Sequence, residues 1–494
     1  MKIDTKVILL INIYIKGVIT LNFGLVSIFI PILVIVLAAF TKRIIPSLTI
    51  GILVGGILLG KGNVIDGTIL AIEHLVKAAA SEESLYIILF LFVFGAFGEI
   101  MKLSGGIKGF SELANKYVKT EKGALGTIWL VTLFTFIDCC FHVISTGTIG
   151  KALIDKLKGN KYKLAHVVNV TSCLLIILIP FGTTYIGYIV GVIASSLNKV
   201  GLKESPYNMF IKSIPFNFYA IVMLLISISV ILFNFGFTKI NTSVNKKQQE
   251  ESEHSGHEAH EQCKFEEKAP PRPFNLILPL SLLIASTFFF FWYTGKGKGS
   301  GFFNALINAQ FEKSILLSGI LTIVLTSIFY VIQKIPMKEI ESHFLSGGNE
   351  IVPPIIVLIL SWGLSSIVED LGFVDFVTNV VGDKIPALLI PAAIFLIGCA
   401  ASYFMGSAWG TWALVMPIAL PLAVSTSSSI PLVIGAVLAG GSLGDNASPL
   451  GETAVLSATI SDIPIMEHVK SQLPYSLSAV GISTALFVIA ALIL

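Results

Sequence analysis

The sequence predicts an all-α polytopic membrane protein with inverted-topology repeats and with broken or re-entrant helices at the midplane of the bilayer. Of its 494 residues, 54% are hydrophobic and 13% are charged, whereas soluble domains are about 25% charged. Apolar runs close to the length of a membrane span recur along the chain, and they predict about 11–13 helical segments. Several of these runs are short or are interrupted by glycine and proline, which favours broken helices.

The helical segments follow from a window of about 19 residues moved along the chain. In order they are 25–41, 44–60, 84–101, 124–138, 165–198, 212–235, 273–293, 313–333, 352–369, 385–404, 411–424, 429–443 and 473–494. We group them into N-terminal helices (1–84), a first repeat (85–237), a hydrophilic linker (238–272), connecting helices (273–351) and a second repeat (352–494).

The linker combines many charges with prolines and has too few apolar side chains to bury a core. His254, His257 and His260 lie three residues apart within it, a spacing that could hold a transition metal if the segment were helical. The many charges and prolines favour a solvated segment over a folded metal site. We therefore interpret the segment as a solvated linker with incidental histidines.

The charge and the cysteines exclude other classes of protein. The formal net charge of +3 is spread over loops, so a nucleic-acid partner is not expected and the bilayer is the expected environment. Four of the five cysteines lie in apolar surroundings, where a reduced thiol is usual, so no disulfide framework is expected.

Three features recur in the same order in the two halves of the chain. The pairs are Phe97–Leu103 with Ser365–Leu371, Ser145–Leu153 with Ser407–Leu414, and Pro180–Thr184 with Pro449–Thr453. Paired interruptions at matching places predict a secondary-transporter site at the interface between repeats. The alternative is that the small residues only allow helices to pack closely.

Two carboxylates inside apolar segments are the strongest candidates for chemistry. Asp138 ends an apolar run, and Asp445 lies in the glycine-rich run before Pro449. An acid within the membrane is costly and usually faces a cavity, a partner or an ion path. The alternative for each is a helix N-cap, a position that Asp favours. Glu99 and Glu369 lie close to the ends of their spans, so we rank them lower.

Oxygen-rich breaks complete the predicted site for a cation, a proton or a substrate, because hard cations select oxygen ligands. We expect Na⁺ as the coupling ion at Asp138, Asp445, Asn446 and Ser448, and no cofactor. Half-helices that start after Gly147 and Gly410 would direct their positive ends at an anionic group. The further predicted site residues are Ser145, Thr146, Thr148, Gly182, Thr183, Thr184, Ser407, Trp409, Thr411, Pro449, Glu452 and Thr453.

Two further residue types have less specific explanations. Asp138 and His142 have the spacing i, i+4, with two cysteines between them, which would suit a metal. Without a second ligand pair, packing explains the histidine better. Trp409 could form a wall of the cavity, although a membrane tryptophan is more often an interfacial anchor.

Three motifs together resemble the NhaC-type Na⁺/H⁺ antiporter family, within the larger ion-transporter superfamily. They are Ile137–Phe141 with Gly147 and Thr148, Ser407–Thr411, and Gly444–Pro449. The resemblance covers about residues 85–494 without the linker, and the Gly-Asp-Asn-x-Ser-Pro run is its most specific part.

The resemblance implies a multi-pass transporter of the bacterial inner membrane, commonly dimeric, that exchanges Na⁺ for H⁺. Asp138 and Asp445 match acids of the family's motifs. Two departures weaken pure cation exchange: Cys139 and Cys140 replace an acid and a tyrosine, and Asn169 replaces an acid. Some relatives instead move malate, lactate or amino acids, so a small organic solute is the alternative substrate.

Two other functions are weaker alternatives. An intramembrane aspartyl protease would use Asp138 and Asp445 to share a proton and activate water. The run Gly441–Asp445 lacks the Gly-x-Gly-Asp spacing of such enzymes, and we predict that the protein is not an enzyme. A receptor or scaffold is also disfavoured, because the sequence predicts no folded soluble domain that would receive a signal.

Overall fold

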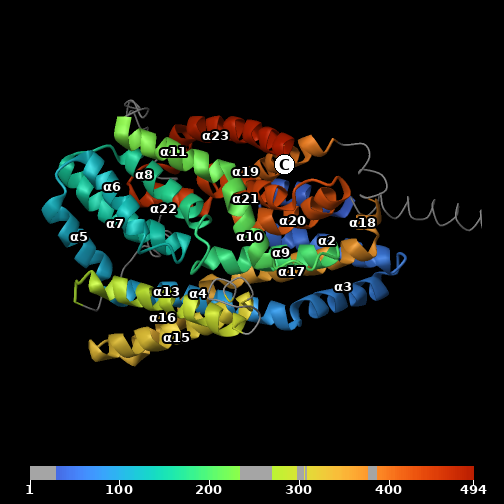
Figure 1. The fold of residues 1–494 in the computed structure, drawn as a ribbon, viewed down its shortest axis with the longest axis horizontal. Coiled ribbons are helices and arrows are strands. Elements are labelled where there is room, and N and C mark those ends of the chain that lie inside the picture. The colour runs from blue at the N-terminus through green and yellow to red at the C-terminus, as the bar shows by residue number, and fades with distance from the viewer. Residues whose placement is uncertain (1–28, 234–269, 297–304, 306–308, 377–385) are drawn as a thin grey trace, which may run out of the picture.

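The computed structural model describes residues 29–233, 270–296, 305, 309–376 and 386–494. Within these ranges every regular element is a helix (Figure 1). Eight of the described helices are long and apolar enough to cross a membrane, or ten if each of two bent pairs is one span. The all-α membrane class is thereby confirmed. The predicted linker lies almost wholly outside the described residues, as do its three histidines.

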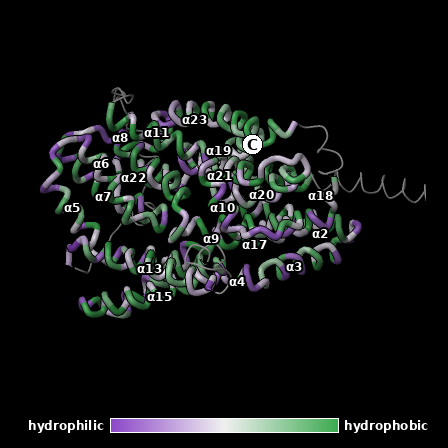
Figure 2. Tube along the Cα trace, viewed as in Figure 1, coloured by the Kyte–Doolittle hydropathy of each residue, from purple (hydrophilic) through white to green (hydrophobic). Residues whose placement is uncertain are grey.

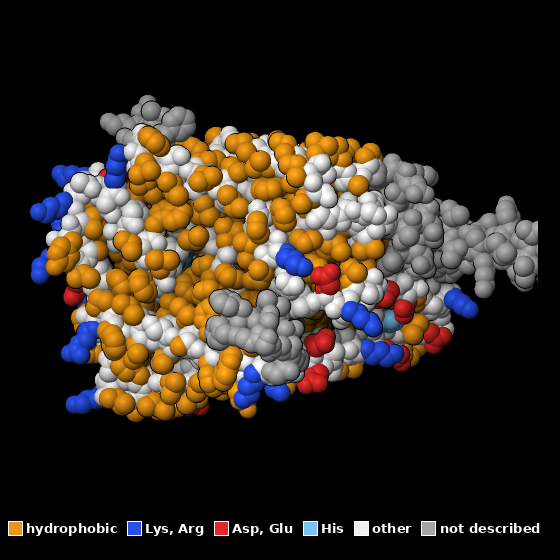
Figure 3. Space-filling view, viewed as in Figure 1, with side chains coloured by type: hydrophobic (Ala, Val, Ile, Leu, Met, Phe, Trp, Pro, Cys, Tyr) orange, Lys and Arg blue, Asp and Glu red, His pale blue; other side chains and the backbone are white. Residues whose placement is uncertain are grey.

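The molecule has the surface of a membrane protein. Figure 3 shows a broad apolar band on one face, with charged side chains gathered toward its two ends. The peripheral helices α13 (Phe274–Gly295) and α15 (Phe311–Ile332) are apolar along most of their length (Figure 2). Apolar side chains facing outward on these helices match a lipid environment.

The chain begins its described part with a helix over Phe29–Thr41. It continues with α2 (Ile44–Leu59) and α3 (Val64–Ala79), which are bent by 119° relative to each other. Asn63 caps α3 by accepting a hydrogen bond from the backbone N–H of Ile65 at 3.0 Å. Both α2 and α3 pack on α17 of the second half.

The first half forms a bundle with two breaks. Its elements are α4 (Glu82–Met101), η1 (Lys102–Ser104), α5 (Gly106–Tyr117), α6 (Glu121–Thr132), α7 (Cys139–Leu157), α8 (Lys161–Asn169), the π-helical η2 (Val170–Leu174), α9 (Thr184–Lys199), α10 (Pro206–Ser213), η3 (Ile214–Phe216) and α11 (Phe218–Phe233).

The second half follows three connecting helices, α13, α15 and α16 (Met337–Glu350). Both α15 and α16 pack on α4. The elements of the second half are α17 (Val352–Asp370), α18 (Phe373–Phe376), η5 (Ala387–Leu389), α19 (Ile390–Met405), α20 (Ala408–Ser425), α21 (Ile430–Ala447), α22 (Glu452–Ile460) and α23 (Ile465–Ile493).

The two halves carry breaks in the same order. The break between α6 and α7 corresponds to the one between α19 and α20, and the break before α9 corresponds to the one before α22. Gly406 has a φ of +66°, and a Cβ there would lie 2.4 Å from Cβ of Leu450. Only glycine fits this left-handed, crowded position, so the two breaks of the second half touch.

The glycine-rich run before Asp445 has a packing role. A Cβ on Gly444 would lie 2.2 Å from the backbone oxygen of Ser402 on α19. The hydroxyl of Ser402 donates to the carbonyl of Gly440 at 2.8 Å and accepts from the N–H of Gly444 at 3.1 Å. Small residues let α19 and α21 approach closely, as is common in membranes. The packing alternative therefore explains the glycines of this run, although not its carboxylate.

One predicted helix start was wrong. No half-helix begins after Gly147, because α7 begins eight residues earlier, at Cys139. The carboxylate of Asp138 caps this start, and the hydroxyls of Ser145, Thr146 and Thr148 donate to carbonyls four residues back. These bonds satisfy the three hydroxyls inside the helix, and α7 continues without a break through Gly147.

Candidate functional site

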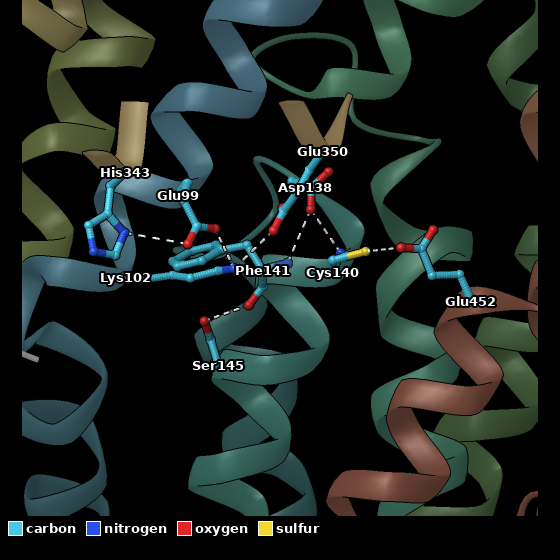
Figure 4. Close-up of polar contacts among 9 residues, drawn as sticks. All are labelled: Glu99, Lys102, Asp138, Cys140, Phe141, Ser145, His343, Glu350 and Glu452. Carbon is cyan, nitrogen blue, oxygen red and sulfur yellow. Dashed lines mark hydrogen bonds and ion pairs between the residues drawn. The ribbon is translucent and has the colours of Figure 1, made fainter. Parts of the chain in front are cut away.

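A cavity of about 500 Å³ opens between the two halves. The breaks before α7, α20 and α22 meet at its wall, and α4, α16 and α17 complete it. The polar residues that line the cavity include Glu99, Lys102, Asp138, Cys139, Cys140, Glu350, Ser407 and Glu452. Figure 4 shows most of them.

Asp138 both caps a helix and lines the cavity. One carboxylate oxygen accepts hydrogen bonds from the backbone N–H groups of Cys140 at 2.9 Å and Phe141 at 3.1 Å. The other accepts from the hydroxyl of Thr184 at 3.2 Å. The N–H of Thr184 in turn donates to the carbonyl of Ile137 at 2.9 Å. Asp138 therefore joins the starts of α7 and α9.

Asp445 is buried beside the start of α20 and is not among the residues that line the cavity. Its side chain accepts from the hydroxyl of Tyr185 at 3.1 Å and lies 3.5 Å from the backbone N–H of Ala408. Ala408 is the first residue of α20, so the positive end of that helix faces the carboxylate. None of the ion pairs among the described residues includes Asp445. Residues Thr184 and Tyr185 thus bring the two acids to one helix start.

Glu452 is the first residue of α22 and faces the first half of the chain. The thiol of Cys140 donates to its carboxylate at 2.9 Å (Figure 4). Glu452 lines the cavity, and it follows the break that begins after Asp445. This break therefore contributes two carboxylates to the region between the halves.

A charged cluster from α4 and α16 forms another side of the cavity. Lys102 forms an ion pair with Glu99 and lies 3.9 Å from Glu350. His343 lies 3.4 Å from the other oxygen of Glu99. Among the described lining residues Lys102 is the single cation, against four carboxylates, those of Glu99, Asp138, Glu350 and Glu452. One positive and four negative groups give a formal charge of −3 when all are ionised.

A second polar network lies behind the cavity, around the π-helix η2. The side-chain amide of Asn169 donates to the backbone carbonyl of Asn446 at 2.8 Å and lies 3.0 Å from Nε2 of His468. The hydroxyl of Thr453 donates to the backbone carbonyl of Asp445 at 2.8 Å and lies 3.2 Å from Asn169. The structure therefore brings Asn169 and Thr453 together with the Asp445 break.

Asn446 points away from the cavity. Its side-chain oxygen accepts from the hydroxyl of Tyr219 at 3.0 Å and from the amide of Gln472 at 3.1 Å. These partners belong to α11 and α23. The side chain thus ties α21 to the outer helices of both halves.

The remaining predicted residues have mainly local contacts. The hydroxyls of Thr183, Ser407 and Ser448 accept backbone N–H groups at the breaks, and that of Thr411 donates to the carbonyl of Ser407. Gly182 has a φ of +68° in the break before α9, two residues after Pro180. A Cβ on Gly410 would meet Ile44 at 2.2 Å, and one on Gly147 would meet Ile460 at 2.6 Å. Pro449 lies in the turn between α21 and α22.

Trp409 is a wall of the cavity rather than an interfacial anchor. It is 8% exposed and lines the cavity. The centroid of its ring lies 4.8 Å from that of Tyr185 and 4.7 Å from that of Tyr188, and both pairs pack edge to face. Aromatic packing of this kind stabilises the start of α20 against α9.

His142 and Glu369 lie outside the cavity lining. His142 is directed at the hydroxyls of Thr135 at 2.8 Å and Thr171 at 3.1 Å. Glu369 pairs with Lys199 at 3.9 Å. Lys102, His343 and Glu350 are part of the charged cluster but were not among the predicted site residues. The spacing of Glu99 and Lys102 as a charged i, i+3 pair was the one available signal.

The sequence and the fold are similar to those of known transporters. The model of the Na⁺/H⁺ antiporter family matches residues 175–492. An uncharacterized protein of Haemophilus influenzae is 27% identical over 482 residues, which is 94% of this chain and 90% of the relative.

Two shorter matches have named activities. The Na⁺/H⁺ antiporter NhaC of Bacillus subtilis is 31% identical over 166 residues, 31% of this chain and 34% of the relative. The arginine/ornithine antiporter ArcD of Halobacterium salinarum is 29% identical over 134 residues, 27% of this chain and 24% of the relative.

Among solved structures, MtrF of Neisseria gonorrhoeae, described as one of a class of antimetabolite efflux pumps, has a similar fold. Its TM-score is 0.52 at 16% sequence identity, covering 87% of this chain and 85% of that chain.

Proposed function

This chain belongs to the Na⁺/H⁺ antiporter family and is a secondary active antiporter rather than an enzyme, and from this premise we propose that it exchanges Na⁺ for H⁺ by alternating access. In this proposal Asp445 and Asp138 bind the cation or the proton. Glu452 is the third acid of the site. The protein would act in the bacterial inner membrane, and a homodimer is the expected assembly.

The observation that carries the proposal is the convergence of carboxylates on one helix start. Asp138 and Asp445 are bonded to the neighbouring residues Thr184 and Tyr185. A carboxylate away from water favours its protonated form, whereas a bound cation favours the ionised form. One acid can therefore hold a proton and Na⁺ alternately, which is the requirement for exchange.

A second candidate substrate is a small organic solute with an ammonium group, such as an amino acid. A cavity of about 500 Å³ is much larger than a bare ion requires and falls within the range of small-molecule sites. Lys102 could meet the carboxylate of such a solute, and Asp138 or Glu452 its ammonium group. The similarity to an arginine/ornithine antiporter agrees with this candidate.

Proton movement in proteoliposomes tests both candidates. For Na⁺/H⁺ exchange, addition of Na⁺ moves protons through the unmodified protein, and this movement is lost in Asp445→Asn and in Asp138→Asn. Glu83→Gln, an exposed acid at the start of α4, is the matched control and retains it. Proton movement that follows arginine but not Na⁺ supports the second candidate. No response to either class of solute contradicts both.

A further inference from the structure

Two adjacent thiols lie at the start of α7, where they line the cavity. The sulfur atoms of Cys139 and Cys140 are 3.9 Å apart. They lie together with a carboxylate oxygen of Asp138, and all three ligand atoms are within 4.8 Å of one another. Because all three residues line the cavity, a cation could reach them from it.

A fourth ligand comes from the other half of the chain. Figure 4 shows the side chain of Cys140 directed at Glu452, and the sulfur lies 2.9 Å from the carboxylate oxygen. Two sulfurs and one carboxylate oxygen thus form a group in the cavity wall, and Glu452 adjoins this group through Cys140. Zn²⁺ and other thiophilic cations bind cysteine sulfur as well as carboxylate oxygen, whereas Na⁺ selects oxygen ligands.

The separation of the two sulfur atoms fits a tetrahedral metal. With metal–sulfur bonds of about 2.3 Å, two sulfurs at a tetrahedral centre are about 3.8 Å apart, close to the 3.9 Å observed. The carboxylate oxygen of Glu452 would replace its present hydrogen bond from Cys140 by a bond to the metal. His142 is not part of the set, because its ring is held by Thr135 and Thr171.

We propose that Asp138, Cys139, Cys140 and Glu452 form a binding site for a thiophilic divalent cation of the Zn²⁺ class. On binding, both S–H bonds break, two S–metal bonds form, and the two protons leave through the cavity to water. The bound ion connects α7 of the first half to α22 of the second half. It therefore holds the two halves together.

Co²⁺ alone is the probe, added to the full-length protein in detergent under reducing conditions, because cobalt bound to thiolates absorbs strongly in the near ultraviolet. A sulfur-to-cobalt absorption band that saturates at one Co²⁺ per chain is expected. The band is lost in Cys139→Ser and Cys140→Ser, and the Co²⁺ affinity that it reports falls at least tenfold in Glu452→Gln. Cys399→Ser and Cys263→Ser are matched controls that retain the band.

A second measurement in the unmodified protein covers the case in which a variant does not fold. Zn²⁺ is expected to slow the reaction of Cys140 with a maleimide, followed by peptide mass, and a chelator is expected to restore it. Absence of a thiolate band, a band that survives loss of both cysteines, or labelling of Cys140 that Zn²⁺ does not change would overturn the proposal. Because neither measurement involves transport, they are independent of the substrate proposed above.

Discussion

At the scale of single residues, Asp138 has two roles that the structure makes separable. Its carboxylate caps α7 through the N–H groups of Cys140 and Phe141, and its charge contributes to the cavity. Asparagine is as good an N-cap as aspartate, whereas alanine is not. The two substitutions therefore remove the charge alone or the charge together with the cap.

We expect Asp138→Asn to unfold in detergent at nearly the same temperature as the unmodified protein while losing cation-driven proton movement. Asp138→Ala is expected to lose about 1 kcal/mol of stability as well, since it leaves two backbone N–H groups without an acceptor. Thermal unfolding and flux, measured on the same preparations, check this. Equal stability of the two variants would mean that the cap contributes little.

The residues that sequence reasoning could find are those with a chemical signature inside an apolar run. Asp138 and Asp445 were found because a carboxylate in a membrane segment is costly. Lys102, His343 and Glu350 were missed because they meet only where α16 packs on α4. That packing depends on Gly347, where a Cβ would lie 2.4 Å from the backbone oxygen of Gly95, and no local pattern reveals it.

At the scale of helices, the breaks before α20 and α22 could be predicted from glycine and proline. The start of α7 could not, because residues 133–138 before it contain no glycine or proline and Asp138 caps the helix. The space around each glycine distinguishes glycines with a packing role from glycines without one. Gly444 approaches Ser402 of α19, whereas a Cβ added to Gly126 of α6 would have no neighbouring atom within 4 Å.

We expect Gly444→Ala to lower the free energy of unfolding by about 1–3 kcal/mol, since the added methyl group forces α19 and α21 apart. Gly126→Ala is the control, and it is expected to stabilise α6 by about 0.5–1 kcal/mol because alanine loses less entropy in a helix. Thermal unfolding of both variants in detergent measures the difference. If both changes shift the transition equally, close packing of α19 on α21 does not explain Gly444.

At the scale of the whole molecule, polar contacts at one end connect the two halves. Asp462, between α22 and α23, accepts hydrogen bonds from Lys151 at 2.7 Å and Lys161 at 3.2 Å. Partial burial favours the neutral acid, but these two lysines outweigh it and hold the pKa of Asp462 below its usual value. Nearby, the hydroxyl of Tyr162 donates to Glu467, which joins α8 to α23.

A lowered pKa in the folded state means that the ionised carboxylate stabilises the protein above its unfolded pKa of about 4. This contribution is lost as the pH falls through the lower, folded value. Because the pair is partly exposed, we expect it to be less than about 1 kcal/mol. Asp462→Asn, which tolerates the left-handed backbone at this position, should therefore match the unmodified protein in acid and unfold at a lower temperature at neutral pH. A gap in unfolding temperature that does not change with pH would contradict the assignment.

The start of α9 has a consequence for how the two acids behave. Thr184 and Tyr185 are consecutive, and each bonds one of the acids, so a rotation or shift of this single turn changes the surroundings of both carboxylates at once. If both acids bind a cation or a proton, as proposed above, occupancy at Asp138 influences occupancy at Asp445, and uptake or release follows a joint equilibrium instead of two separate ones.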